Sequence, residues 1–221
     1  MSEGYNLCND AIIDFVATSR RFVPHFHMPW QSGSDVILQR MHLRYDTALY
    51  AELVARIKQL TPDACIGVDV ITGTPSETEE EFVKTHALLR SIAVDHLHVF
   101  AYSARANTSA VRMEDAVPRE QCRERTKQLS ILSSKLQRAF YEKYIGTTRT
   151  VLFEAEESAD LMHGCTDNYI RVGEAMEHFR LPQYLVFGGG YPQNRTIGPV
   201  RPKQCNASLS VGRRCCGLAT A

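Results

Sequence analysis

Strands and helices alternate through the middle of the chain, and this alternation constrains the fold more than any other feature of the sequence. Cys65–Ile71 is rich in β-branched residues and predicts a buried strand, which runs into a turn at Thr72–Pro75. A helix with an acidic first turn follows, and His96–Tyr102 predicts the next strand. Strand, helix and strand at this spacing are typical of a βαβ unit, so we expect an α/β fold with a parallel sheet.

Further elements are expected upstream of this unit. Apolar spacing and turn residues predict a helix over 10–22, an extended run at His25–Trp30, a short helix over Val36–Met41 and a helix from about Leu49 to Leu60. Asp46 or Thr47 can cap the last of these. In the helix after Pro75, the capping box is either Ser76 with Glu79 or Thr78 with Glu81.

The pattern changes after Pro118. A long amphipathic helix is predicted from Pro118 to about Tyr144. Thr148–Phe153 and Asn168–Val172 then predict strands of a small β module, with a turn at Gly164–Asp167 between them. From residue 188 to the end the chain has no acidic residue and no periodicity, and we expect a disordered or out-of-frame basic tail.

Composition limits the partners and cofactors of the chain. The 221 residues have a formal net charge of zero, so contact with nucleic acid would require a local basic face. The sequence has no apolar run of the roughly 20 residues that a membrane span needs and no signal peptide, so we expect a cytoplasmic protein with no membrane partner. None of the 7 cysteines stands in Cys-x2-Cys or Cys-x3-Cys-x2-Cys spacing, and we expect them to be mostly small buried side chains.

Histidines alternate along the first predicted strand. His25 and His27 are two residues apart and therefore share one face of that strand. Two imidazoles on one face can chelate a metal ion, but the sequence shows no third ligand beside them. A packed or hydrogen-bonded pair is the favoured interpretation, and no metal site is predicted.

Three polar loops follow the predicted strands and carry the candidate chemistry. They are Gln31–Asp35, Thr72–Glu77 and Ser103–Thr108, the last of which contains Arg105. Functional residues in α/β folds gather at the carboxyl ends of parallel strands. Each loop alone is equally consistent with an ordinary turn, and a solvated loop arginine explains Arg105 as well as an anion-binding one does.

Taken in order, the loops resemble those of the radical S-adenosylmethionine (SAM) methylthiotransferases. The motifs are Gln-Ser-Gly-Ser at Gln31–Ser34, Arg44-Tyr45, Asp-x-Ile-x-Gly-x-Pro-x-Glu-Thr at Asp69–Thr78, and Tyr-Ser-x-Arg-x-x-Thr at Tyr102–Thr108. The resemblance covers residues 11–172, and Leu97–Phe100 is most similar to the branch that acts on N6-threonylcarbamoyladenosine of tRNA. Thr166–Val172 is similar to the start of the family's RNA-binding β-barrel, the TRAM domain.

The resemblance implies a fold and a division into regions. Residues 1–146 would be the C-terminal part of a radical-SAM α/β barrel, which is a partial TIM-like barrel. Residues 147–187 would be an incomplete TRAM-like β module, and 188–221 the basic tail.

The resemblance also implies an activity, which is insertion of a methylthio group at adenine C-2 of an anticodon-loop adenosine of tRNA. The family uses SAM, [4Fe–4S] clusters and an electron donor. Residues implied to bind SAM are Gln31, Ser32, Gly33, Ser34, Asp69, Ile71, Gly73 and Arg105. Residues implied to contact substrate or RNA are Arg44, Tyr45, Tyr102, Asn168 and Arg171. Since the cluster cysteines are missing from this sequence, the chain alone is expected to be inactive.

The chain departs from the family pattern, and other functions remain open. The family has Phe-Pro-Gly where this chain has Thr74–Ser76, and Gly where it has Asn107, so the loop geometry at both places is in question. The alternatives are the related enzyme that acts on N6-isopentenyladenosine of tRNA and a non-catalytic tRNA-binding remnant. A cluster-free aldolase is disfavoured because the lysines fall in predicted helices or the tail, not at strand ends.

Overall fold

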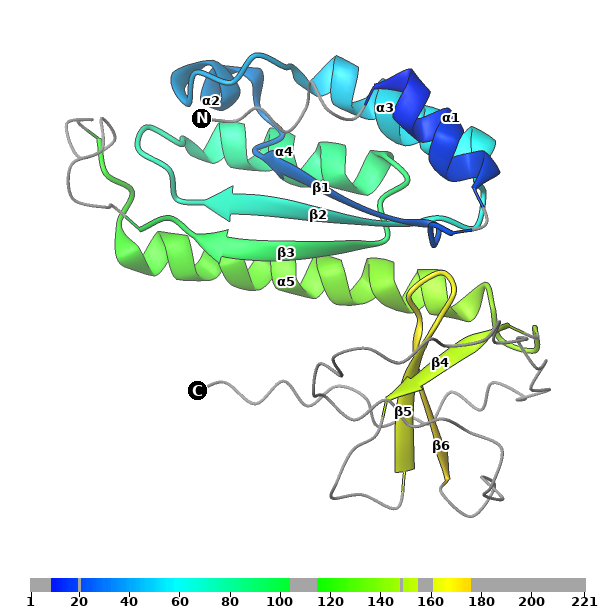
Figure 1. The fold of residues 1–221 in the computed structure, drawn as a ribbon. Helices are drawn as coiled ribbons and strands as arrows, with labels where there is room; N and C mark the ends of the chain where they lie inside the picture. Colours follow the sequence, from blue (N-terminus) through cyan, green and yellow to red (C-terminus); the bar gives the residue numbers. More distant parts are fainter. Residues whose placement is uncertain (1–8, 20, 104–114, 148, 155–160, 176–221) are drawn as a thin grey trace, which may run out of the picture. The chain divides into compact units, whose positions relative to one another are not determined.

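The structure divides into two compact units, Met1–Phe140 and Tyr141–Ala221. It is a computed structural model that describes residues 9–19, 21–103, 115–147, 149–154 and 161–175 (Figure 1). Arg105, Asn107 and the tail from residue 188 therefore lie outside the described residues. The predicted region boundaries at 146 and 187 stay predictions.

A three-stranded parallel sheet forms the centre of the first unit. Its order is β1 (His25–Gln31), β2 (Cys65–Thr72) and β3 (His96–Ala101). His25 pairs with Cys65 at the start of β1, and Asp69 of β2 pairs with His98 of β3. The parallel βαβ arrangement that the sequence predicts is therefore confirmed, and the carboxyl ends of the three strands meet at one edge of the sheet.

In the part of the chain that the structure describes, five helices accompany this sheet: α1 (Asp10–Thr18), α2 (Asp35–Arg40), α3 (Thr47–Leu60), α4 (Glu79–Ser91) and α5 (Arg119–Glu142). Polar side chains cap several of them, as the sequence predicts. Asp46 accepts from the backbone of Leu49 at the start of α3, and Thr78 accepts from the backbone of Glu81 at the start of α4. Of the two N-caps considered for α4, Thr78 is therefore the one observed, while the Glu81 carboxylate accepts from Ser34 and Lys84.

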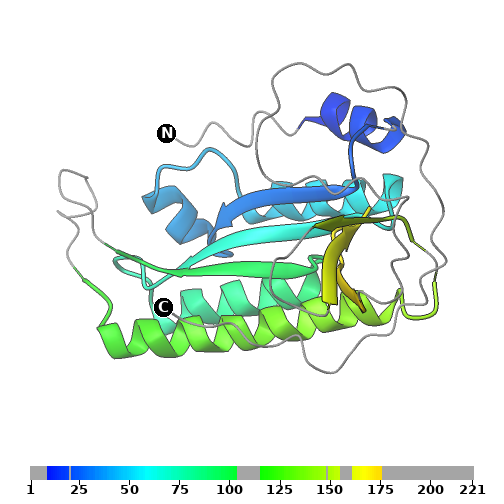
Figure 2. The same cartoon turned by 60° about the horizontal axis from the view of Figure 1, so that its bottom comes forward.

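The two faces of the sheet differ in character. Side chains that alternate along the strands, such as Trp30, Val68 and Leu97, are buried and pack against the helices in one hydrophobic core. Figure 2 shows α4 and α5 along this side of the sheet. The residues between them in sequence point to the opposite face, which carries His27 and His98.

The second unit contains a three-stranded antiparallel sheet. Its order is β4 (Val151–Glu154), β5 (Leu161–Thr166) and β6 (Arg171–Ala175). The prediction that a turn begins at Gly164 is wrong, because Gly164–Thr166 belongs to β5. The strand predicted from Asn168 begins instead at Arg171.

A side-chain network explains the later start of β6. The Thr166 hydroxyl donates to the Asn168 side-chain carbonyl at 2.6 Å and accepts from the Ile170 backbone N–H at 2.8 Å. Tyr169 adopts a left-handed conformation with φ of 68°. These contacts form a tight hairpin turn that alternation in the sequence does not reveal.

None of the helices within the described ranges has the length and apolar character that crossing a membrane requires.

Candidate functional site

The loops after the three parallel strands lie at one edge of the sheet. Strand β1 ends at Gln31 and its loop begins at Ser32, the turn after β2 begins at Gly73, and β3 runs into Tyr102. The backbone N–H of Tyr102 donates to the Thr72 carbonyl at 2.8 Å and so continues the ladder past the end of β3. The structure thus brings together the segments that carry the motifs, at the edge where α/β folds bind ligands.

The Ser32–Ser34 turn is anchored to helix α4. Ser34 donates a hydrogen bond to the Glu81 carboxylate, and the Gly33 N–H donates to the Thr85 hydroxyl at 3.1 Å. The Ser32 hydroxyl lies 3.4 Å from that same hydroxyl. Both serine side chains are buried and engaged inside the protein, which gives them a structural role beside any contact with SAM.

Gly33 is required by packing at this anchor. A Cβ atom on Gly33 would lie 2.7 Å from the Thr85 Cα, which is closer than real contacts allow. The structure thus shows a close approach of the α4 backbone at this residue, which the resemblance also implies in SAM binding.

The hydrogen bond from Ser34 also changes the pKa of the Glu81 carboxyl group. Together with the Lys84 ammonium 2.9 Å away, it lowers the pKa of Glu81 below its ordinary value, because both groups stabilise the carboxylate form.

Gln31 differs from its neighbours in the turn. Its φ is 76°, in the left-handed region that non-glycine residues rarely adopt. The residue is half-buried, and its side-chain amide makes no hydrogen bond to any other described residue. A strained residue with an available amide at the carboxyl end of a strand is suited to ligand binding.

A buried ion pair holds the turn after β2. The Glu77 carboxylate accepts from the Gly73 backbone N–H at 2.7 Å and from Arg125 Nη1 of α5 at 2.8 Å. Both side chains of the pair are only 2% exposed. Burial raises the pKa of Glu77, while the Gly73 N–H and Arg125 oppose that shift.

Sequence reasoning missed Arg125. A signal for it exists, because Arg125 lies three residues after Cys122 and four before Leu129, on the apolar stripe of α5. A charged residue on such a stripe indicates a buried partner.

Gly73 and Ser76 define the backbone of the same turn. Gly73 has φ of 75°, and a Cβ atom there would lie 2.2 Å from the Cys122 Sγ. Ser76 has φ of 63°. This is the position at which the family pattern has glycine, so the left-handed geometry that the pattern suggests is present here without the glycine.

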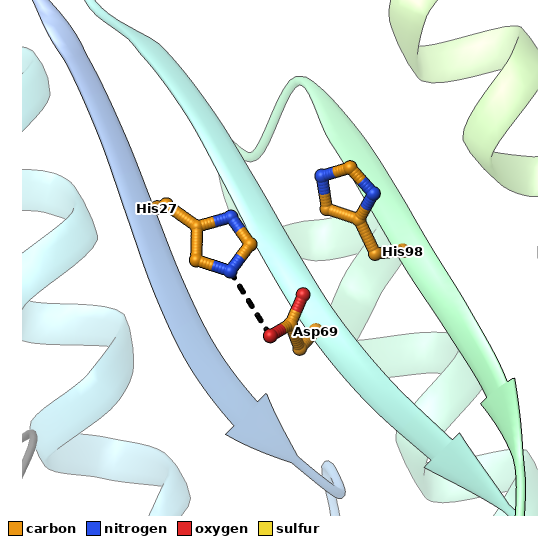
Figure 3. Close-up of side chains that lie close together, drawn as sticks. All are labelled: His27, Asp69 and His98. Carbon is orange, nitrogen blue, oxygen red and sulfur yellow. Dashed lines mark hydrogen bonds and ion pairs between the residues drawn. The ribbon is translucent and has the colours of Figure 1, made fainter.

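Histidines and an aspartate cluster on the polar face of the sheet. Figure 3 shows His27, Asp69 and His98 pointing toward one another from β1, β2 and β3. His27 Nε2 lies 3.0 Å from Asp69 Oδ2, and the ligand atoms of all three residues lie within 4.8 Å of one another. His96 adjoins them, with Nε2 3.1 Å from His98 Nε2. Burial and the neighbouring histidines lower the pKa of His96 to about 4, so its ring is neutral at pH 7.

The residues of β2 that are predicted to bind SAM lie in different surroundings. Asp69 is paired with His27 on the polar face. Ile71 is half-buried and lies in register with the exposed Phe100 of β3. Arg105 lies outside the described residues.

The residues predicted to contact substrate or RNA belong to both units. Arg44 is exposed, whereas Tyr45 is part of the core and donates its hydroxyl to the Trp30 carbonyl at 2.9 Å. Core packing therefore accounts for Tyr45 without a ligand. In the second unit Asn168 is buried in the β5–β6 turn and Arg171 is exposed at the start of β6.

The described residues do not fit an iron–sulfur cluster. Their cysteines stand on separate elements, with Cys65 on β2, Cys122 on α5 and Cys165 on β5. Among the described residues, the group able to hold a metal ion is His27, Asp69 and His98, which contains no thiol. Such clusters are normally held by cysteine thiolates, so no step can be assigned to a cluster on these residues.

Comparison with known proteins identifies the family. No protein-family model matches the chain. The chain is 33% identical over 192 residues to the threonylcarbamoyladenosine tRNA methylthiotransferase MtaB of Bacillus subtilis, an alignment that includes 84% of this chain. It is 36% identical over 161 residues, or 72% of this chain, to the tRNA-2-methylthio-N(6)-dimethylallyladenosine synthase of Bacillus velezensis. The chain belongs to the tRNA methylthiotransferase family.

The match covers part of each methylthiotransferase. The chain spans 43% of the length of the Bacillus subtilis relative and 32% of the Bacillus velezensis relative. A synthase of the second type from Staphylococcus aureus is 32% identical over 80% of this chain and 34% of its own length. The chain therefore corresponds in sequence to only part of each of these relatives.

Proposed function

We propose that this chain is a segment of a radical-SAM enzyme that inserts a methylthio group at adenine C-2 of N6-threonylcarbamoyladenosine in the anticodon loop of tRNA. The observation that carries the proposal is the 33% identity over 84% of the chain to a relative whose name gives that substrate. As the whole enzyme acts on tRNA, we place it in the cytoplasm.

In this proposal the first unit is part of the radical-SAM barrel and binds SAM along the carboxyl edge of its sheet. SAM and two [4Fe–4S] clusters would supply the radical chemistry and the methyl group. Gln31 would contact SAM through its available amide, and Ser32–Ser34 would hold the Gln31 backbone in place through α4. Asp69, Ile71, Gly73 and Arg105 complete the proposed SAM contacts. Tyr102 would lie beside the substrate. The TRAM-like second unit would bind tRNA through the exposed Arg171, while the buried Asn168 would hold the β5–β6 turn that precedes it.

The chain alone is proposed to be inactive. No three cysteines of the sequence have the spacing that holds a radical-SAM cluster, so the clusters and the electron donor would act elsewhere in a whole enzyme. The test is anaerobic treatment of the full chain with iron and sulfide, followed by desalting and absorbance spectroscopy. No stable cluster absorbance is expected, and a stoichiometric four-iron cluster would overturn this part of the proposal.

A segment exchange tests the function itself. The corresponding segment of the Bacillus subtilis relative would be replaced by residues 9–175 of this chain, and methylthiolated nucleosides in tRNA would be measured. Restored product on threonylcarbamoyladenosine is expected, while Gln31→Ala in the same chimera should reduce it. A chimera that folds and keeps its clusters, but makes no product whether residue 31 is Gln or Ala, would contradict the proposal.

One observation favours a second substrate. Relatives named for dimethylallyladenosine reach 36% identity, slightly above the 33% of the other type, although over a shorter part of the chain. The same chimera, given tRNA that carries either nucleoside, separates the two. Product on dimethylallyladenosine alone would favour the second candidate.

A further inference from the structure

The polar face of the β1–β3 sheet carries an array of imidazoles around one carboxylate. His27 lies on β1, Asp69 on β2, and His96 and His98 on β3. The sequence alone shows only His25 and His27 as neighbours and offers no third ligand. The fold supplies it, because parallel pairing sets Asp69 directly opposite His98 and one strand away from His27.

From this arrangement we propose that His27, Asp69 and His98 form a binding site for a divalent transition-metal ion, with Zn²⁺ as the best match. Two imidazoles and one carboxylate are a ligand set that binds Zn²⁺ and Fe²⁺ while leaving a coordination position open. The proposal does not depend on the proposed methylthiotransferase activity. In it Asp69 is a ligand of the ion, and an ion bound there would exclude Asp69 from the SAM contact proposed above.

The distances suit such an ion after small side-chain rotations. Ligand atoms around a tetrahedral zinc lie about 3.3 Å apart, given Zn–N and Zn–O bonds of about 2.0–2.1 Å. His27 Nε2 and Asp69 Oδ2 are already 3.0 Å apart, and no pair of ligand atoms in the group exceeds 4.8 Å. Each ligand stands on a different strand of one sheet, so the backbone holds the site without relying on a loop.

His96 extends the site toward a fourth ligand. Its Nε2 lies 3.1 Å from His98 Nε2, so it can either support the His98 ring or turn toward the ion. Gly67 makes room for it, because a Cβ atom at that position would lie 2.5 Å from the His96 ring. The glycine in β2 is thus explained by the placement of an imidazole.

Without an ion, the same residues would form a hydrogen-bonded network centred on the His27–Asp69 pair. The two interpretations differ in a measurable way. A network needs no metal and would bind none tightly, whereas a site would bind one ion per chain and lose it when a single ligand is replaced.

The experiment titrates the full chain with Zn²⁺ by calorimetry at pH 7, after removal of bound metal, and compares His27→Gln, His98→Gln and Asp69→Asn. His27 and His98 are exposed, so their replacement leaves the hydrophobic core intact. His86→Gln on α4 is the matched control. Each ligand variant is expected to weaken the tightest site by more than about 10-fold, and the control should leave it unchanged.

Co²⁺ identifies the ligands independently, since the chain also has 7 cysteines. Absorbance of Co²⁺ bound at the tightest site should lack the intense near-ultraviolet band of cobalt thiolates. Binding in the ligand variants that equals that of the unaltered chain, or a thiolate band at the tightest site, would overturn the proposal. So would the absence of stoichiometric binding.

Discussion

At the scale of single residues, Ser76 holds a backbone conformation that favours glycine. Its φ of 63° lies in the left-handed region, where a Cβ atom costs about 1–2 kcal/mol. Ser76→Gly removes this strain but adds freedom to the unfolded chain, so we expect a net gain of roughly 0.5–1 kcal/mol in the free energy of unfolding. Urea denaturation measures it.

A serine in a helix provides the control for this prediction. Ser134 lies within α5, where glycine is unfavourable, so Ser134→Gly should lower the free energy of unfolding by about 0.5–1 kcal/mol. If both substitutions lower the free energy of unfolding equally, the strain that the structure indicates at the Ser76 backbone is not present.

The contact between Ser34 and Glu81 predicts a dependence of stability on pH. The folded-state pKa of Glu81 lies below the ordinary 4.5, so its stabilising effect is present above pH 4.5 and is lost as the pH falls through the lower, folded value. Ser34→Ala removes the main cause of the lowered pKa. Its destabilising effect should therefore be larger at pH 7 than at pH 3.

Denaturation of both chains at the two pH values tests this dependence. Some loss at pH 3 is expected because Ser34 also caps α2 through the Ile37 N–H. Ser91→Ala serves as the control, since that hydroxyl donates to the Leu88 carbonyl and touches no titrating group. A Ser34→Ala effect that is equal at both pH values would contradict the assignment.

At the scale of elements, Arg125 connects α5 to the turn after β2. Removing one member of a buried ion pair leaves an uncompensated charge and typically costs about 3–5 kcal/mol. Arg125→Met should therefore destabilise strongly, and Glu77→Gln should reduce that cost when combined with it. A double-mutant cycle by denaturation should show a coupling of at least about 1 kcal/mol.

Arg123 is the matched control for this cycle. It lies on the same helix with its side chain 79% exposed, and its Nη1 is 3.9 Å from a carboxylate oxygen of Glu120, whose side chain is 90% exposed. Arg123→Met should change the free energy of unfolding by no more than about 0.5 kcal/mol. Strictly additive effects of Arg125→Met and Glu77→Gln would show that the pair does not hold the turn.

Most elements of the first unit could be predicted because each has a strong local signal. The β-branched run of β2 and the capping threonine of α4 are contiguous in sequence and depend little on the rest of the fold. The strand β5 was missed because its Gly164 and Thr166 read as turn residues. The bonds that place Thr166 in a strand are made with residues after it and carry no periodic pattern.

The candidate site was predictable in its segments but not in its contacts. Strand ends followed by polar motifs indicate the carboxyl edge of the sheet. The engagement of Ser32 and Ser34 with α4 depends on how that helix packs, which no local pattern encodes. The same is true of His98, which joins His27 only through the pairing of both outer strands with β2.

At the scale of the whole molecule, each of the two units is proposed to carry one part of the function, SAM binding in the first and tRNA binding in the second. The parallel sheet of the first unit has one face buried in the hydrophobic core and a polar face with His27 and Asp69. The antiparallel sheet of the second unit presents Arg171 to solvent. Because each unit has a sheet of its own, substitutions in the full chain can test the proposed role of one unit at a time.

Binding to tRNA is the prediction that belongs to this scale. Since the net charge is zero, affinity must come from local basic residues rather than from the overall field. Arg171→Ala should weaken binding of unmodified tRNA to the full chain and reduce the slope of log affinity against log salt by about 0.7–0.9, the value for one lost phosphate contact. Arg123→Ala, which removes an exposed arginine from α5, should change neither quantity. Filter binding over a salt series measures both. Equal losses of affinity in the two variants would mean that tRNA binding depends only on the total charge of the chain. The RNA-binding role of the second unit would then be rejected.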